Sequence, residues 1–275
     1  MIPRPYMCKL NPSTTHNTAY PFKRIETCIR LSDLAYQDPA NMLMLEDVLE
    51  GYPKFIEHDH TQAYLWKFKD PNVLFLAFRG TECLEDVMDD VDIRLTHVKN
   101  SQVFVHNGFL RQYKSLEDDI LKELKKEEPS ANPHIVCCGH SSGGALATLG
   151  AVLLSEQLGE AYVFECYTIG APRVGNVAFC DLFNAHIKSN ALRIVNANDP
   201  VPMVPITHCY CHVIPAIVID DSGDVYEVTA DMPWYIRPFY ATLNLDFKHL
   251  ILDHQCMVYA HRIKVFASIL QSMDV

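Results

Sequence analysis

A serine flanked by glycines lies between a short apolar run and an alanine-rich run near the middle of the chain. The apolar run, residues 134–138, predicts a buried strand, and residues 143–158 predict a helix. The sequence G-H-S-S-G at 139–143 joins them. In a G-x-S-x-G pattern the serine occupies a sharp turn, and its neighbours must be small because strand and helix approach closely. The segment predicts a nucleophile elbow with Ser141 at its apex, where the helix N-terminus favours a developing negative charge.

Strand-like and helical segments alternate along most of the chain, with no internal repeat. Such alternation is typical of a parallel sheet covered on both faces. Together with the elbow, it predicts an α/β fold of the α/β-hydrolase type, with a mostly parallel central sheet covered by helices on both faces. For 275 residues we expect a single domain over 25–275, preceded by an N-terminal surface segment over 1–24. The expected strands are 63–68, 73–78, 162–169 and 191–196 with an edge hairpin at 212–219 and 225–229, and the other expected helices are 25–35, 112–127 and 178–188.

The net charge of the chain and its first ten residues indicate which partners and which cellular location to expect. The chain has 34 acidic and 23 basic side chains, and its net charge of −11 disfavours nucleic acid and strongly anionic membranes as partners. Pro3 and Pro5 interrupt residues 1–10, where a secretory signal would need a continuous apolar stretch. The longest apolar runs, such as 145–154, are shorter than the roughly 20 residues that span a bilayer. We therefore expect neither a signal peptide nor a transmembrane helix, and an intracellular, cytoplasmic protein.

The ten cysteines favour buried, reduced thiols over a disulfide framework, since several lie in strand-like apolar runs such as residues 135–138. One cluster, Cys209, Cys211 and His212, comes near the spacing of zinc ligands. A strand there would direct neighbouring side chains to opposite faces, which argues against a metal site. We expect no metal and no organic cofactor.

Four further segments accompany the elbow sequence G-H-S-S-G-G-A-L-A in a defined order. They are F-R-G-T at 78–81, V-H-N-G-F at 105–109, T-I-G-A-P-R-V-G-N at 168–176 and N-D-P-V-P at 198–202. Together these five motifs resemble those of the class 3, or fungal-type, lipases of the α/β-hydrolase superfamily, and the resemblance extends from about residue 31 to residue 261. Ser142 departs from the pattern, because the family usually has leucine after the nucleophile. Only the middle residue of the elbow lies at its apex, so the nucleophile is still expected to be Ser141.

A serine nucleophile needs a base and an orienting carboxylate, in the chain order Ser, Asp, His. Asp199 follows the strand expected at 191–196, at the edge of the sheet where α/β sites lie. Its segment resembles the acid motif of the family, although an aspartate before proline is also a common turn former. The base is expected to be His254, because L-D-H-Q-C-M-V-Y resembles the family's D-H-x-x-x-x-Y ending. His249 is the main alternative, and His212 matches a structural histidine of the family; His208 and His261 also follow the acid.

The oxyanion hole is expected to consist of the backbone N–H groups of Ser142 and Thr81. The resemblance implies that the Thr81 hydroxyl adds a third donor. His106 and His140 precede the acid and are expected to pack or hydrogen-bond around the site. In the family, a lid helix follows the oxyanion strand. Here residues 82–96 alternate apolar and acidic side chains as an amphipathic helix would, and this pattern fits a mobile lid and a fixed surface helix equally well.

These residues predict a serine hydrolase that cleaves carboxylic esters of lipids through an acyl-enzyme on Ser141. The expected partner is a lipid or acyl-ester substrate, with transient contact with a lipid surface and no stable protein partner. Two alternatives remain open. One is a catalytically weak lipase-fold scaffold that binds a protein partner, although such scaffolds usually lose members of the triad. The other is acyl transfer to an acceptor other than water, which uses the same residues.

Overall fold

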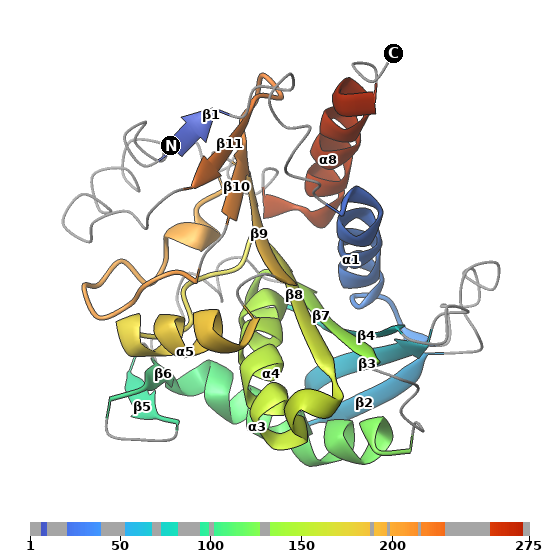
Figure 1. Ribbon diagram of the computed structural model, residues 1–275, viewed down its shortest axis with the longest axis vertical. Coiled ribbons are helices and arrows are strands. Elements are labelled where there is room, and N and C mark those ends of the chain that lie inside the picture. Colours follow the sequence, from blue (N-terminus) through green and yellow to red (C-terminus); the bar gives the residue numbers. More distant parts are fainter. Residues whose placement is uncertain are drawn as a thin grey trace.

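The computed structural model describes residues 7–9, 21–39, 53–67, 73–81, 94–98, 102–126, 133–187, 190–196, 199–213, 216–228 and 254–271. They form a nine-stranded sheet with helices on both faces, and a second sheet of two strands (Figure 1). The helices are α1 (Phe22–Leu34), α3 (Asn107–Leu124), α4 (Ser142–Leu158), α5 (Val177–Ile187) and α8 (Cys256–Gln271), with 3-10 turns at Gly159–Ala161 and Val201–Met203. The strands are β1 (Met7–Lys9), β2 (Lys54–His58), β3 (Thr61–Lys67), β4 (Val73–Phe78), β5 (Leu95–His97), β6 (Phe104–His106), β7 (His134–His140), β8 (Val163–Ile169), β9 (Ala191–Asn196), β10 (Ala216–Ile219) and β11 (Val225–Val228).

The centre of the large sheet is parallel and both edges are antiparallel. Its strand order is β1-β11-β10-β9-β8-β7-β4-β3-β2. The five central strands, from β10 to β4, pair in parallel. Antiparallel pairs add β3 and β2 at one edge, and β11 and β1 at the other. The parallel strands therefore end at one side of the sheet, where the turns that follow β4, β7, β8 and β9 come together.

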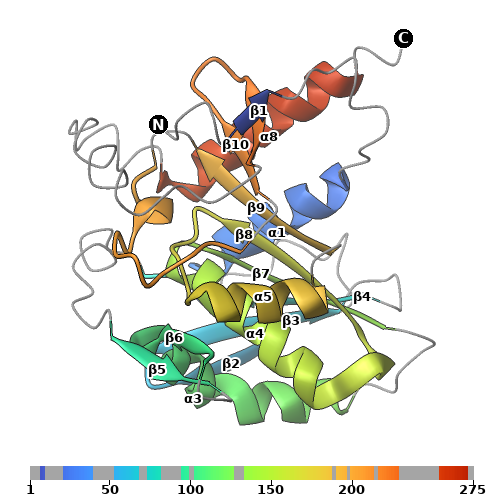
Figure 2. The same cartoon turned by 60° about the vertical axis from the view of Figure 1, so that its left-hand side comes forward.

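Strand β7 shows why both faces of the sheet are covered. Ile135 and Cys137 belong to the core beneath α3, α4 and α5, whereas Val136 and Cys138 belong to the core beneath α1 and α8. Successive side chains of a strand point to opposite faces, so a strand that is apolar at every position must be covered twice. Figure 2 shows the resulting three layers, with α1 and α8 on one side of the sheet and α3, α4 and α5 on the other.

Helix α4 is the most buried helix of the described structure. All residues from Ser142 to Leu154 are buried, because the helix lies between the sheet, α3 and α5. A helix that is apolar around its whole circumference belongs in such a position. The elbow that precedes α4 is thus anchored on both sides by buried elements.

The expected fold class is confirmed, and most expected elements lie within a few residues of their observed bounds. Helix α3 begins at Asn107, earlier than the expected 112, because the His106 side chain accepts a hydrogen bond from the Phe109 N–H and caps it. Strand β2 was not expected, and β10 is shorter than expected. Of the expected helix at 82–96, residues 82–93 lie outside the described residues, and Leu95 and Thr96 form part of strand β5. The boundary between an N-terminal surface segment and the domain at residue 24 remains a prediction. Within the expected surface segment, Met7–Lys9 pairs with β11 at the sheet edge.

The eight cysteines whose side chains are described are all free thiols, and six of them lie in the two cores, at positions 28, 137, 138, 166, 180 and 256. Burial raises the pKa of the Cys137 and Cys256 thiols well above the usual value, which favours the uncharged form. Within the described ranges, no helix has both the length and the apolar character that crossing a bilayer requires.

Candidate active site

The turn between β7 and α4 has the strained geometry expected of the elbow. Ser141 has φ 57° and ψ −133°, a backbone conformation that residues other than glycine rarely adopt. Its N–H donates to the carbonyl oxygen of Ile169 at 2.9 Å, and its own carbonyl accepts the Gly144 N–H at 2.9 Å. A Cβ atom on Gly139 would lie 2.2 Å from the Gly143 carbonyl oxygen, so no larger residue fits there. The turn is thereby held rigidly with the serine at its apex.

The Ser141 side chain is fully buried, and its hydroxyl has no hydrogen-bond partner among the described residues. Buried hydroxyls usually have a partner, and exceptions tend to mark functional positions. A Cβ atom on Gly143 would clash with the Phe78 carbonyl oxygen and the Gly80 backbone nitrogen. The elbow therefore packs closely against the end of β4.

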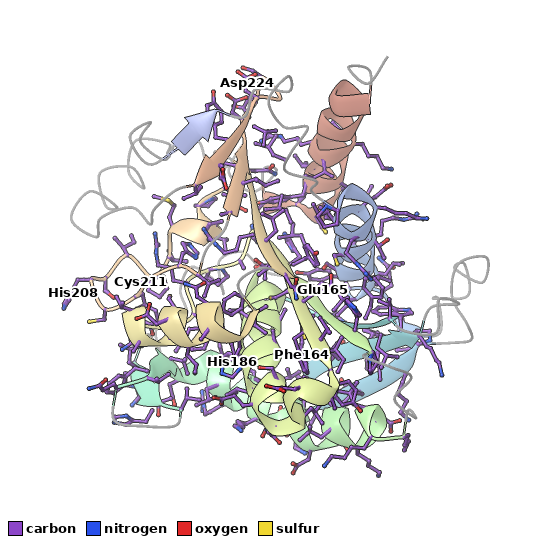
Figure 3. All side chains as sticks on the ribbon, viewed as in Figure 1. Phe164, Glu165, His186, His208, Cys211 and Asp224 are labelled. Atoms are coloured by element: carbon purple, nitrogen blue, oxygen red, sulfur yellow. The ribbon has the colours of Figure 1, made fainter. Side chains whose placement is uncertain are left out.

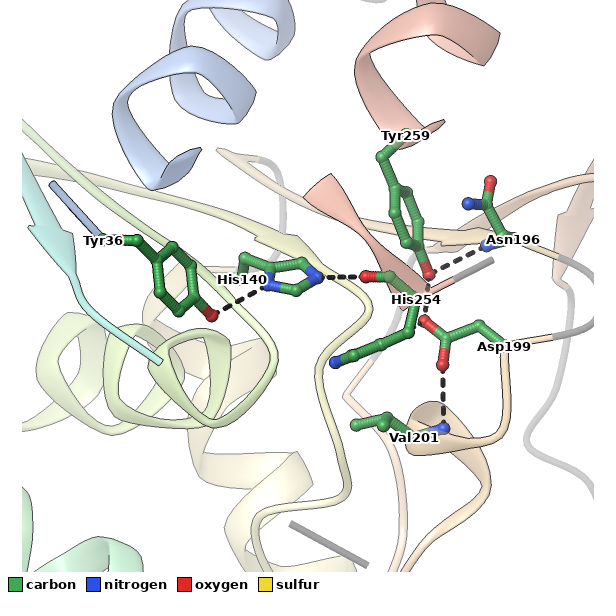
Figure 4. Close-up of polar contacts among 7 residues, drawn as sticks. All are labelled: Tyr36, His140, Asn196, Asp199, Val201, His254 and Tyr259. Atoms are coloured by element: carbon green, nitrogen blue, oxygen red, sulfur yellow. Dashed lines mark hydrogen bonds and ion pairs between the residues drawn. The ribbon is translucent and has the colours of Figure 1, made fainter. Parts of the chain in front are cut away.

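Asp199 lies just beyond the end of β9, and three donors hold its carboxylate. One oxygen, Oδ1, accepts the Val201 N–H at 2.9 Å from the short turn that follows. The other, Oδ2, accepts from His254 Nδ1 at 2.8 Å and from the Tyr259 hydroxyl at 2.5 Å (Figure 4). The side chain is fully buried. A buried carboxylate with this many donors has a fixed position, and so has the ring that it bonds.

His254 lies immediately before α8, and its backbone places the ring against Asp199. An ionised carboxylate only accepts hydrogen bonds, so Nδ1 carries the hydrogen. In the neutral ring Nε2 is then unprotonated and able to take a proton. The structure therefore brings together the two residues that the sequence assigned as acid and base, in the tautomer that a general base requires.

Tyr259 supports the carboxylate from the first turns of α8. It is fully buried, its hydroxyl donates to Asp199, and it accepts the backbone N–H of Asn196 at 3.0 Å. Burial, and then the negative charge of Asp199, raise the pKa of the Tyr259 hydroxyl well above the usual value, so it remains a donor. The sequence pattern contained Tyr259 but assigned it no role.

His140, the residue before Ser141, holds the backbone of His254. Its Nε2 lies 2.5 Å from the His254 carbonyl oxygen, and its Nδ1 lies 2.9 Å from the Tyr36 hydroxyl. A carbonyl only accepts, so Nε2 donates to it and Nδ1 accepts from the tyrosine. Burial, with a further contribution from His254, lowers the pKa of His140 to about 3, which keeps the ring neutral. Tyr36 was missed in the sequence, because no local pattern indicates a contact across 104 residues.

The two residues expected to form the oxyanion hole, Thr81 and Ser142, are adjacent, but the Thr81 N–H already donates to the Ser142 side chain. Strand β4 pairs in parallel with β7, with Phe78 opposite Gly139, so the residues that follow the two strands meet. The Thr81 N–H donates to Ser142 Oγ at 2.8 Å, and the Thr81 hydroxyl lies 3.0 Å from the same oxygen. The Ser142 side chain thus takes the position next to Thr81 that an oxyanion would use.

A cavity of about 380 Å³ adjoins these two residues. The turn between β2 and β3, the end of β4 and helices α3 and α4 enclose it. Its polar lining comes from His60, Thr61, Gln62, Arg79, Thr81, Gln112 and Ser142, with Leu146 as an apolar contribution. The Arg79 guanidinium donates to Gln62 Oε1 at 2.7 Å, which orders this wall. Polar groups of a substrate would find hydrogen-bond partners there.

The competing histidines differ in placement. His212 is buried and its Nε2 donates to the Pro202 carbonyl at 2.6 Å, in agreement with a structural role. His249 lies outside the described residues. His208 is exposed, and Figure 3 shows it with Cys211 on a loop away from the central sheet. Within the described ranges no group of three or more His, Cys, Asp or Glu side chains could hold a metal ion.

Comparison with known proteins finds lipases similar to this chain. The family of class 3 lipases matches residues 75–208. The chain is 33% identical over 183 residues to secreted mono- and diacylglycerol lipase A of Penicillium cyclopium, covering 65% of this chain and 55% of that protein. It is 35% identical over 119 residues to secreted mono- and diacylglycerol lipase 1 of Fusarium solani, covering 42% of this chain and 34% of the relative. The chain thus spans about half the length, or less, of these two curated relatives.

The fold agrees with a solved lipase. The structure matches the Rhizomucor miehei triacylglyceride lipase with a TM-score of 0.67 and 23% sequence identity, over 86% of this chain and 95% of that one.

The names of these relatives also correct one expectation. Both curated relatives are described as secreted, which contradicts the expected intracellular, cytoplasmic location. That expectation depended on the lack of an apolar stretch in residues 1–10, and a missing pattern does not identify a compartment. The match of residues 75–208 to the class 3 lipases agrees with the five ordered motifs of the sequence, and the solved lipase has the same fold.

Proposed function

We propose that this protein hydrolyses carboxylic esters of lipids, with Ser141 as the nucleophile, His254 as the general acid and base, and Asp199 as the orienting carboxylate. The observation that carries the proposal is the 2.8 Å hydrogen bond between His254 Nδ1 and Asp199, beside a buried serine in a strained elbow. This arrangement leaves Nε2 of the ring available for the serine proton.

In the proposed reaction, Ser141 Oγ attacks the ester carbonyl while its proton moves to His254 Nε2. The resulting imidazolium is stabilised by the carboxylate of Asp199. The negative oxygen of the tetrahedral intermediate accepts hydrogen bonds from the N–H groups of Ser142 and Thr81. The intermediate collapses as His254 returns the proton to the leaving alcohol, and an acyl-enzyme remains. Water then repeats the sequence, which releases the fatty acid and the free serine.

We propose monoacylglycerols and diacylglycerols as the first substrates to test. The two curated relatives are named for these substrates. Partial acylglycerols carry free hydroxyls next to the ester, and the polar cavity beside Thr81 and Ser142 offers partners for such groups. Contact with the lipid surface is expected to be transient.

The test is reaction with a fluorophosphonate, followed by peptide mapping and by assays on monoacylglycerol, diacylglycerol and triacylglycerol. Labelling confined to Ser141, together with ester cleavage, would support the proposal. Labelling at Ser142 would identify a different nucleophile. Unlabelled protein that cleaves no ester would favour the alternative of a lipase-fold scaffold, although the Asp199–His254 pair of the described structure argues against that alternative. Transfer of the acyl group to an added alcohol would identify an acyltransferase.

A further inference from the structure

The side chain that follows the nucleophile makes an unusual contact with the oxyanion residue. Ser142 Oγ accepts the Thr81 N–H at 2.8 Å and lies 3.0 Å from the Thr81 hydroxyl. These are the two groups that Thr81 would offer to the negative oxygen of a tetrahedral intermediate. A side-chain oxygen of the protein therefore already accepts the N–H hydrogen bond that the reaction would need from Thr81 and lies within hydrogen-bond distance of the Thr81 hydroxyl.

A backbone N–H has a single hydrogen, so it cannot serve Ser142 Oγ and a substrate oxygen at full strength together. Ser142 is also held in place, because it is the first residue of α4 and 6% exposed. A tethered hydroxyl is present at a high effective concentration, whereas a water at the same place would exchange with the solvent. Leucine, which the family usually has at this position, could not make this contact.

We propose that the Ser142 hydroxyl occupies the oxyanion site of the free protein and competes with the substrate carbonyl oxygen for the Thr81 N–H. This inference rests on the proposed ester hydrolysis. Ser142 then has two opposing effects: its backbone N–H stabilises the oxyanion, and its hydroxyl must be displaced first. In the free protein, where no substrate oxygen is present, the contact gives the Thr81 backbone N–H a fixed acceptor.

The polar cavity provides room for the displaced hydroxyl. Ser142 forms part of its wall together with Gln62 and Gln112, whose amide groups can donate to or accept from a hydroxyl. When a substrate oxygen takes the Thr81 N–H, the hydroxyl can rotate towards the cavity and keep a polar partner. Ser142 is therefore a positioning residue of the oxyanion hole, because it acts through Thr81.

The contact itself is tested on the free protein, without any substrate. In Ser142→Ala the Thr81 amide loses its acceptor, so its hydrogen should exchange about 3- to 10-fold faster, the range for one neutral hydrogen bond. Ser142→Gly removes the same hydroxyl and should give the same faster exchange. It replaces Ser142→Ala if that variant folds poorly. Ser155→Ala is the control, because it deletes a hydroxyl that bonds within the same helix. An unchanged Thr81 exchange rate in both Ser142 variants would overturn the proposal.

The competition is tested with an alkyl boronic acid, which adds to the serine hydroxyl and places an oxygen in the oxyanion site. Removal of the Ser142 hydroxyl should make this inhibitor bind about 3- to 10-fold more tightly, with an unchanged affinity in Ser155→Ala. Weaker binding in Ser142→Ala would overturn the proposal, because the hydroxyl would then be a donor to the oxyanion. If the boronic acid binds neither the wild type nor the variants and no ester is cleaved, both this inference and the proposed function are wrong.

Discussion

The two sides of the candidate site differ in how far their hydrogen bonds are already made. On the side of the acid and the base, Asp199 has three donors and His254 has partners for both its ring and its backbone carbonyl. On the side of the nucleophile, Ser141 Oγ has no partner among the described residues, and the Thr81 N–H is engaged by Ser142. The acid–base side is thus organised before substrate arrives, whereas the oxyanion side must exchange partners.

The difference follows from what each side does. A general base must keep one orientation through the whole cycle, so permanent hydrogen bonds from buried neighbours help it. In the proposed reaction, Ser141 bonds the substrate only transiently, and the Thr81 N–H exchanges Ser142 for the substrate oxygen. Substitutions on the acid–base side should therefore lower turnover. Those on the oxyanion side should change how readily a substrate oxygen replaces Ser142 at the Thr81 N–H.

The largest effects should come from the nucleophile and the base. Ser141→Ala and His254→Ala should each lower kcat for ester hydrolysis by ~10⁴-fold or more, since proton transfer and covalent catalysis are both lost. Steady-state assays on the purified variants measure this, with Ser155→Ala as a hydroxyl-deletion control. Substantial activity in Ser141→Ala, or near-equal losses in Ser141→Ala and Ser142→Ala, would show that another residue is the nucleophile.

Asp199→Asn should come next, with a loss in kcat of about 10³- to 10⁴-fold. An amide at this position favours the wrong tautomer of His254 and does not stabilise the imidazolium. The double variant with His254→Ala should be scarcely worse than His254→Ala alone, because an absent base needs no orientation. Losses that multiply independently would mean that the two residues do not act as one unit.

Tyr259→Phe tests the support of the carboxylate. It removes the donor to Asp199 and leaves the Asn196 N–H without its acceptor. We expect kcat to fall about tenfold, with little change in KM, and the free energy of unfolding to fall by about 1–3 kcal/mol. Tyr167→Phe is a matched control, since its hydroxyl donates to Glu165, a carboxylate outside the candidate site. An equal loss of activity in both variants would argue that Tyr259 acts only through stability.

His140 should appear in the pH dependence of stability rather than in that of activity. Its pKa of about 3 lies below the usual 6.5, so the unfolded chain binds more protons between these values. Its contribution to stability is therefore complete above pH 6.5 and is lost as the pH falls towards 3, by an amount on the order of 5 kcal/mol.

Chemical unfolding of His140→Gln at several pH values tests this expectation. The variant should show a weaker loss of stability on acidification, because glutamine does not titrate. His208→Gln is the control, since His208 is exposed. The wild-type slope between pH 6.5 and 4 should be retained in His208→Gln. The same slope in His140→Gln would contradict a buried neutral ring at position 140.

Local sequence was sufficient for the elbow and for the strand and helix on either side of it. The apolar run at 134–138, the glycines at 139 and 143 and the Ala-rich run that follows determine a buried strand, a tight turn and a buried helix, whatever lies elsewhere in the chain. The chain order Ser, Asp, His and the family resemblance indicated Asp199 and His254. In the structure His254 Nδ1 lies 2.8 Å from Asp199 Oδ2. Their catalytic roles remain predictions.

Only the tertiary structure decided how distant residues share one hydrogen-bond network. Tyr36 and His140 are 104 residues apart, so no local pattern relates them. Thr81 and Ser142 were expected in one oxyanion hole, but the bond from the Thr81 N–H to the Ser142 side chain, across 61 residues, was not indicated by the sequence. Ser142 is the clearest case: the sequence showed a second hydroxyl in the elbow, but its direction depends on where β4 ends beside β7. Backbone periodicity and turn chemistry are local properties of a sequence, whereas the partner of a polar side chain is set by which elements pack together.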